Sequence, residues 1–186
     1  KNGANLLESH VFQFDFLNDE FTKLPQPLQD IVNDPEKRKK LVIYINPPYA
    51  EATSLKTISN QDSKHKSGVS ISKIKDKYQD ILVQGSKELF ILFIFRCYKE
   101  IKNAYIANFS TLKALQGKHY KKFRNIFQAK LERLFIVPAN TFDNVKGDFP
   151  IGFFIWNTNV KERFESIKID MFDNQGFFVG NKIITI

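Results

Sequence analysis

A short apolar run followed by two consecutive prolines constrains this chain more than any other feature. Leu41–Ile45 (LVIYI) is apolar at every position and rich in β-branched and aromatic residues. That pattern is typical of a strand buried on both faces of a parallel sheet. The run leads directly into Asn46-Pro47-Pro48-Tyr49. Because two prolines fix the backbone and remove two N–H donors, the strand must end there in a rigid turn.

The remainder of the chain alternates predicted strands and helices. Strands are expected over residues 11–16, 105–109, 131–137 and 151–156. Helices are expected over 27–32 and from about 73 to 102, with a break at Gly85, and a basic amphipathic stretch follows at 118–127. Residues 51–74 read as a polar loop, and 167–172 and 177–186 as a hairpin. This order predicts an α/β fold with a mostly parallel open sheet and antiparallel strands added late.

Composition limits the functional classes. The 186 residues carry a net charge of +8, which fits a polyanionic partner. No apolar run approaches the length of a membrane-spanning helix, since Leu89–Phe95 stops at Arg96. The single cysteine, Cys97, excludes an internal disulfide and a multi-cysteine zinc site, and the three histidines lack ligand spacing. We therefore expect a cytoplasmic protein with no metal and no membrane association.

The turn after Leu41–Ile45 has a specific chemical use. Ligands of open α/β sheets bind at the carboxyl ends of the strands. There the amide oxygen of Asn46 and the carbonyl of Pro47, with the backbone stiffened by Pro48, can accept both hydrogens of one amino group. Tyr49 offers a flat face on which a planar base can stack. The alternative interpretation is a turn that merely ends a strand.

Asn46-Pro47-Pro48-Tyr49 resembles the catalytic signature of the amino-group DNA methyltransferases, an Asn/Asp-Pro-Pro-aromatic motif. The resemblance covers roughly residues 11–158 and implies an incomplete Rossmann-like fold that uses S-adenosylmethionine. It assigns Asp15, with Phe16 beside it, to the adenine ring of that cofactor, although Asp15 can equally be a strand-end cap. Phe149 is the candidate to close the other face of a flipped adenine, and Phe153 is a weaker one.

The implied function is adenine-N6 methylation of double-stranded DNA in a restriction–modification system. An endonuclease or specificity module is the expected partner, in the same chain or in a complex. Lys64 and Lys66, in the loop after the motif, and Lys121 and Lys122 are the predicted DNA contacts. The two later lysines can also belong to a solvated helix face.

One departure from the family pattern is serious. The glycine-rich cofactor loop that should precede Asp15 is missing, since Gly3 is the only glycine before Gly68. Residues 1–160 are therefore expected to be the C-terminal portion of a catalytic domain, inactive alone. Residues 161–186 are a hairpin tail or the start of a target-recognition element. Two alternatives stay open: a methyltransferase acting on a protein glutamine, and a non-catalytic DNA-binding subunit that kept the fold.

Overall fold

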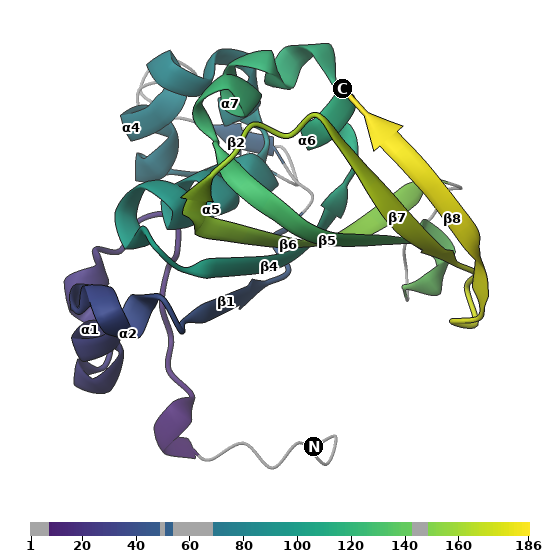
Figure 1. Cartoon of the computed structure of the whole chain (residues 1–186). Helices are drawn as coiled ribbons and strands as arrows, with labels where there is room; N and C mark the ends of the chain where they lie inside the picture. Colours follow the sequence, from purple (N-terminus) through teal and green to yellow (C-terminus); the bar gives the residue numbers. More distant parts are fainter. Residues whose placement is uncertain (1–7, 49–50, 54–68, 143–148) are drawn as a thin grey trace.

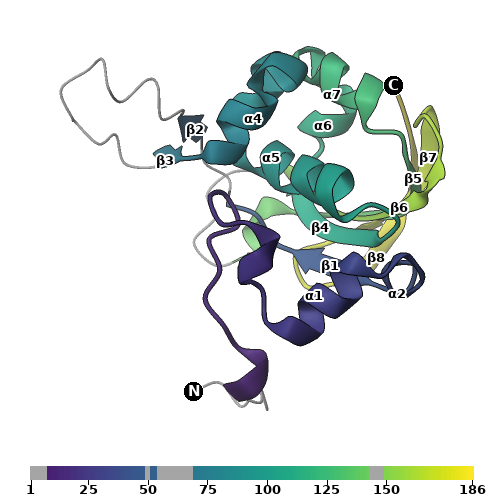
Figure 2. The same ribbon diagram turned by 90° about the vertical axis from the view of Figure 1, so that its left-hand side faces the viewer.

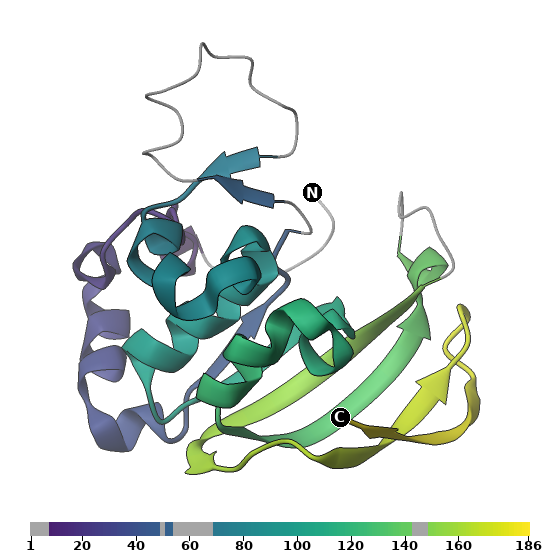
Figure 3. The ribbon, with the colours of Figure 1, turned by 90° about the horizontal axis from the view of Figure 1, so that it is seen from above.

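The computed structural model describes residues 8–48, 51–53, 69–142 and 149–186. They contain a six-stranded sheet with the order β1-β4-β6-β5-β7-β8 (Figure 1). Its strands are β1 (Val42–Ile45), β4 (Tyr105–Thr111), β5 (Ala129–Pro138), β6 (Pro150–Lys161), β7 (Ser166–Phe172) and β8 (Phe178–Thr185). A separate parallel pair, β2 (Glu51–Thr53) and β3 (Val69–Ile71), lies apart from this sheet, next to the helix that follows β3 (Figure 3).

Four helices cover one face of the sheet. The described part of the chain contains the helices α1 (Gln26–Asn33), α2 (Pro35–Arg38), α4 (Lys73–Leu82), α5 (Leu89–Arg96), α6 (Lys113–Gln116) and α7 (Lys121–Ile126). Of these, α4 to α7 form the covering layer (Figure 2). Short 3-10 turns span Glu8–His10, Phe21–Lys23, Val83–Lys87, Lys118–Tyr120 and Ala139–Thr141, and a π-turn spans Cys97–Ile101. No helix in the described part of the chain has the length and apolar character needed to cross a membrane.

The sheet is mixed, so the prediction of a mostly parallel sheet is wrong. Only β1–β4 and β5–β7 pair in parallel within the described sheet, whereas β4–β6, β5–β6 and β7–β8 are antiparallel. The physical reason lies in β6, which turns back from β5 and inserts between β5 and β4. The expectation that antiparallel strands come late in the chain is confirmed.

Strand β1 is an edge strand. Its parallel pairing with β4 agrees with the sequence, but burial on both faces does not. The side chains of Val42 and Tyr44 are 59% and 63% exposed, while Ile43 and Ile45 pack against the core. On the outer face, the Tyr44 ring lies tilted against the Phe153 ring, with 6.2 Å between the ring centroids. The continuous apolar run therefore reflects one buried face and one exposed face.

Two further expectations fail in the first half of the chain. Residues 11–16 form no strand, and a turn follows at 16–18. The alternating phenylalanines of this segment pack against other rings instead: Phe14 lies 6.0 Å from Phe21, and Phe16 stacks on Phe93 at 4.8 Å. Of the predicted loop over 51–74, both ends form the β2–β3 pair, and 54–68 lie outside the described residues.

Other predictions are confirmed. The predicted helix 27–32 lies within α1, and the long helix over 73–102 is interrupted at Gly85, between α4 and α5. The C-terminal hairpin is β7–β8. Its turn is closed by the Asp173 carboxylate, which accepts the N–H groups of Gln175 and Phe177, both at 2.9 Å. Gly176 supplies the positive φ of 86° that this turn requires. Because β7 also pairs with β5, the hairpin extends the main sheet.

Helix α5 (LFILFIFR) is the centre of the core. Leu89, Ile91, Leu92 and Phe95 are fully buried, and only Phe93 is partly exposed. A helix that is apolar on all sides must be enclosed on all sides. The sheet covers α5 on one side, and α4 and α7 lie on the other (Figure 2).

A charged cluster closes the end of α5. The Glu100 carboxylate accepts hydrogen bonds from Lys77 Nζ at 2.8 Å, Tyr78 Oη at 2.8 Å and Arg96 Nε at 2.9 Å. Burial acts to raise the pKa of Glu100, but these three hydrogen bonds outweigh it and hold the pKa below its ordinary value. The ionised carboxylate therefore stabilises the folded state.

We predict that Glu100→Gln lowers the free energy of unfolding by about 2 kcal/mol at pH 7, because charge-assisted hydrogen bonds are lost. The folded-state pKa lies below the unfolded value, so the contribution is complete above that value and disappears as the pH falls further. Urea unfolding at pH 7 and pH 3 should show the difference between variant and wild type shrinking in acid. Glu36→Gln, at an exposed pair with Lys39, is the control and should leave both curves unchanged.

Candidate active site

The proline-rich turn lies where two parallel strands end. The last paired residues of β1 and β4 are Ile45 and Asn108, and β4 runs on to Thr111. Asn46 follows Ile45 directly and is exposed, whereas Pro47 is buried. Open α/β folds bind ligands at this edge of the sheet, where the carboxyl ends of the parallel strands lie. An exposed amide on a buried, rigid support can present its oxygen to a ligand at that edge.

Phe149 reaches the same edge from a different strand. Because β6 runs antiparallel to β4, Ile151 pairs with Thr111, and Phe149 comes just before β6 begins. Its ring is 41% exposed. Its backbone carbonyl accepts the Ala139 N–H at 2.9 Å, which fixes the chain at this point. Asn46 and Phe149 thus lie on the two sides of β4, toward the same end of the sheet, although more than a hundred residues separate them in the sequence.

An open cavity of about 590 Å³ adjoins Phe149. Its walls come from the end of β4, from α6 and from the start of β6, and the lining residues are Thr111, Leu112, Lys113, Gln116, Gly117, Phe149 and Pro150. The volume is in the range of pockets that take small molecules. Phe153, the weaker candidate for stacking, is instead packed on the sheet between Phe109 at 4.8 Å and Phe135 at 5.3 Å.

Asp15 and Phe16 are used locally. The Asp15 carboxylate accepts the Leu17 N–H at 3.0 Å and the Asn18 side-chain amide at 2.8 Å, and so closes a turn. The Phe16 ring stacks on Phe93 of α5. Neither residue lines the cavity beside Phe149. Asp15 is exposed, and a carboxylate offers about four acceptor positions, so capacity for a further donor remains.

The other predicted site residues divide into two groups. Tyr49, Lys64 and Lys66 lie outside the described residues. Lys121 and Lys122 are exposed at the start of α7. Lys121 lines a second cavity on the opposite side of α6 from the one beside Phe149. Among the described residues, no group of three histidine, cysteine or carboxylate side chains could hold a metal ion.

The sequence interpretation missed two polar residues at this edge. Asn108 has no exposed surface, and neither atom of its side-chain amide has a hydrogen-bond partner. The Thr111 hydroxyl, which borders the cavity beside Phe149, is likewise buried and unpartnered. A sequence signal existed: in β4 (YIANFST), Asn108 falls on the same face as the core residue Ile106. Buried polar groups without partners are rare and mark strained or functional positions.

We predict that Asn108→Leu raises the free energy of unfolding by about 1 kcal/mol, because an unsatisfied buried amide is replaced by an apolar side chain of similar size. Asn157→Leu is the matched control. Asn157 is also buried, but its side chain bonds to Glu132 at 3.0 Å and to Asn159, so this change should destabilise the fold. Chemical denaturation measures both. A loss of stability in Asn108→Leu equal to that in Asn157→Leu would contradict the prediction.

No family model and no curated protein matches the sequence. Solved structures with a similar arrangement include a type I restriction-modification methyltransferase subunit from Streptococcus thermophilus (TM-score 0.46, 17% identity, 84% of this chain and 29% of that chain). Another is a modification subunit of a putative type I restriction enzyme from Vibrio vulnificus YJ016 (TM-score 0.45, 12% identity, 73% and 28%). A third is the type IIG restriction endonuclease BpuSI (TM-score 0.45, 18% identity, 77% and 16%).

The chain spans less than a third of the length of each of these three proteins. All three TM-scores lie below 0.5. The function proposed below therefore rests on the residues at the sheet edge.

Proposed function

We propose that this chain carries the base-binding half of the active site of a DNA adenine-N6 methyltransferase of the restriction–modification type. One observation carries the proposal: Asn46-Pro47-Pro48 stands at the end of β1, and the cavity beside Phe149 opens at the neighbouring end of β4. In this arrangement the Asn46 amide, the Pro47 carbonyl and the Phe149 ring would bind one planar ligand that carries an amino group.

In this proposal each residue has a defined task. The Asn46 side-chain oxygen and the Pro47 carbonyl accept the two hydrogens of the adenine N6 amino group. Those bonds pull the nitrogen toward tetrahedral geometry and free its lone pair. Tyr49 and Phe149 stack on the two faces of a base turned out of the duplex and replace the stacking that it loses there. Lys64, Lys66, Lys121 and Lys122 provide positive charge for the DNA backbone.

The cofactor of this reaction is S-adenosylmethionine, which when bound supplies a methyl group on a positively charged sulfur. Of the residues present, Asp15 fits its adenine ring: the carboxylate is exposed and retains acceptor capacity beyond its two local bonds. Phe16 holds this turn against α5 rather than offering a free ring. The chain contributes positioning and hydrogen-bond acceptors, which is the protein's usual share in such chemistry.

We predict that Asn46→Ala lowers methyl transfer to DNA by about 100-fold or more, as expected when a preorganised polar contact to the reacting group is lost. The measurement is the transfer of labelled methyl from S-adenosylmethionine to unmethylated duplex DNA by the full-length protein, with digestion to identify N6-methyladenine. Asn174→Ala, in the exposed β7–β8 turn, is the control and should keep full activity.

The same assay separates the alternatives. Label on a protein glutamine instead of DNA would replace the proposal by the protein methyltransferase. A folded full-length protein that binds DNA but neither binds the cofactor nor transfers label would replace it by the non-catalytic subunit. Equal activity in Asn46→Ala and wild type would remove Asn46 from the site.

We predict that Phe149→Ala lowers kcat/KM for DNA methylation by about ten-fold, because stacking of a base on an aromatic ring is lost. The Phe149 ring is half-exposed, so the melting temperature should change little. Phe177→Ala is the matched control, since Phe177 is 66% exposed in the hairpin turn far along the sheet. If both variants lose activity equally, Phe149 has no special role.

A further inference from the structure

A second, smaller cavity lies between the helix layer and the end of the chain. Its volume is about 100 Å³, and helices α6 and α7, strand β6 and the segment after β6 surround it. Ring and aliphatic groups of Leu115, Phe127, Trp156 and Phe164 form much of its wall. The space is enough for several water molecules or for one tetrahedral oxyanion.

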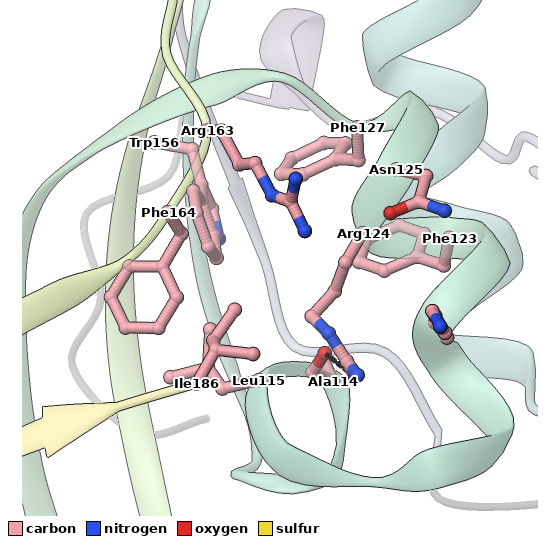
Figure 4. A pocket seen from close by; sticks show the side chains of 11 residues that line it. Ala114, Leu115, Phe123, Arg124, Asn125, Phe127, Trp156, Arg163, Phe164 and Ile186 are labelled. Carbon is pink, nitrogen blue, oxygen red and sulfur yellow. Dashed lines mark hydrogen bonds between the residues drawn. The ribbon is translucent and has the colours of Figure 1, made fainter.

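The polar groups that face this cavity are mainly donors. Lys121, Arg124 and Arg163 all line it, and Figure 4 shows the side chains of Arg124, Arg163 and Trp156 directed into the same gap. No aspartate or glutamate is among the lining residues. Neither arginine takes part in an ion pair among the described residues. The cavity therefore has a concentrated positive charge with no acidic residue in its wall.

A buried donor without a partner points into the cavity. Trp156 is 4% exposed, and its indole N–H has no hydrogen-bond acceptor. A buried indole N–H normally finds a partner, and leaving it unpaired costs free energy. A ligand oxygen in the cavity would satisfy it. The unpaired indole N–H is an observation separate from the two arginines, and it also indicates a ligand that accepts hydrogen bonds.

Hydrogen bonds to the backbone fix the Arg124 side chain at this cavity. One of its nitrogens, Nη1, donates to the carbonyls of Gly117 at 2.8 Å and Ala114 at 3.2 Å, which fixes the guanidinium plane. Burial, and then the nearby Arg163 cation, lower the pKa of Arg124. Two cations that repel each other at one cavity are stabilised by an anion between them. Planar guanidinium groups suit the oxygens of a phosphate in particular.

We propose that this cavity, formed by Arg124, Arg163, Lys121 and Trp156, binds a phosphate group. The site is separate from the one proposed for the methylated base, and it does not depend on methyl transfer. The phosphate belongs either to the DNA backbone or to a free phosphate-bearing molecule. Both sources present the same tetrahedral oxyanion to the two guanidinium groups and the indole N–H.

The test uses the fluorescence of Trp156, the single tryptophan of the chain. The protein is titrated with inorganic phosphate at constant ionic strength, with chloride as the balancing salt. The expected result is a saturable change in Trp156 emission with phosphate that chloride alone does not produce. Arg163→Gln should raise the apparent Kd at least ten-fold, whereas Arg133→Gln, at an exposed position of β5, should leave it unchanged.

Two further measurements keep the result unambiguous. Trp156→Phe removes the N–H but keeps an aromatic ring, and phosphate should raise the melting temperature of this variant less than that of the wild type. A short DNA duplex that competes with phosphate identifies the backbone as the source, while a duplex that does not compete identifies a free oxyanion. The proposal is overturned if phosphate gives no saturable response, or if Arg163→Gln responds as the wild type does. In either case the cavity holds water alone.

Discussion

The buried guanidinium of Arg96 holds the N-terminal segment on the fold. The side chain is 1% exposed. It donates to the backbone carbonyls of Phe16 and Asp19 and to the Glu100 carboxylate, and its guanidinium lies over the rings of Phe16 at 5.1 Å and Phe21 at 4.4 Å. A buried cation is tolerated only when it is paired and its donors are used. Arg96 meets both conditions: Glu100 is its ion-pair partner, and the carbonyls of the N-terminal segment accept its remaining donors.

This arrangement holds the segment that contains residues 11–16 without strand pairing. A strand needs a neighbour for its N–H and C=O groups, and residues 11–16 do not pair with the open side of β1, the edge strand, which pairs only with β4 in the described sheet. The carbonyls of Phe16 and Asp19 instead go to Arg96, and the Leu17 carbonyl accepts the Ile74 N–H of α4 at 3.2 Å. The turn that carries Asp15 is therefore fixed to α4 and α5. Any role of Asp15 in holding a cofactor depends on this attachment.

Sequence reasoning located the elements whose signal is local. Three elements could be predicted from their own residues alone. They are β1, from the apolar run before the prolines; α7, from its basic stretch; and the β7–β8 hairpin, from the turn at Asp173. Sequence reasoning failed where the outcome depends on neighbours that a sequence does not display. The alternating pattern of residues 11–16 fits both a strand and an irregular segment whose phenylalanines pack on the core. The apolar run of β1 likewise fits both a central strand and an edge strand.

The candidate site shows the same division. Asn46 could be singled out because two prolines follow it, and its place at a strand end could be inferred from the order of the elements. That Phe149 arrives at the same edge depends on β6 running antiparallel beside β4, which the sequence indicated only in part. Asn108 and Trp156 were missed because their meaning lies in the lack of a partner. A missing hydrogen bond becomes visible only when the surroundings are known.

The two cavities share helix α6 as a wall. Lys113 and Gln116 of α6 border the cavity beside Phe149, while Ala114 and Leu115 border the one beside Trp156. Its C-terminal end is closely packed, because a Cβ at Gly117 would lie 2.6 Å from the Tyr120 ring and 2.8 Å from the Lys113 carbonyl. Arg124 fastens the same end through the Ala114 and Gly117 carbonyls. A phosphate held by Arg124 would therefore brace the wall of the cavity proposed for the base. If the phosphate is that of the DNA backbone, its anchoring and the stacking of the base would act through one short helix.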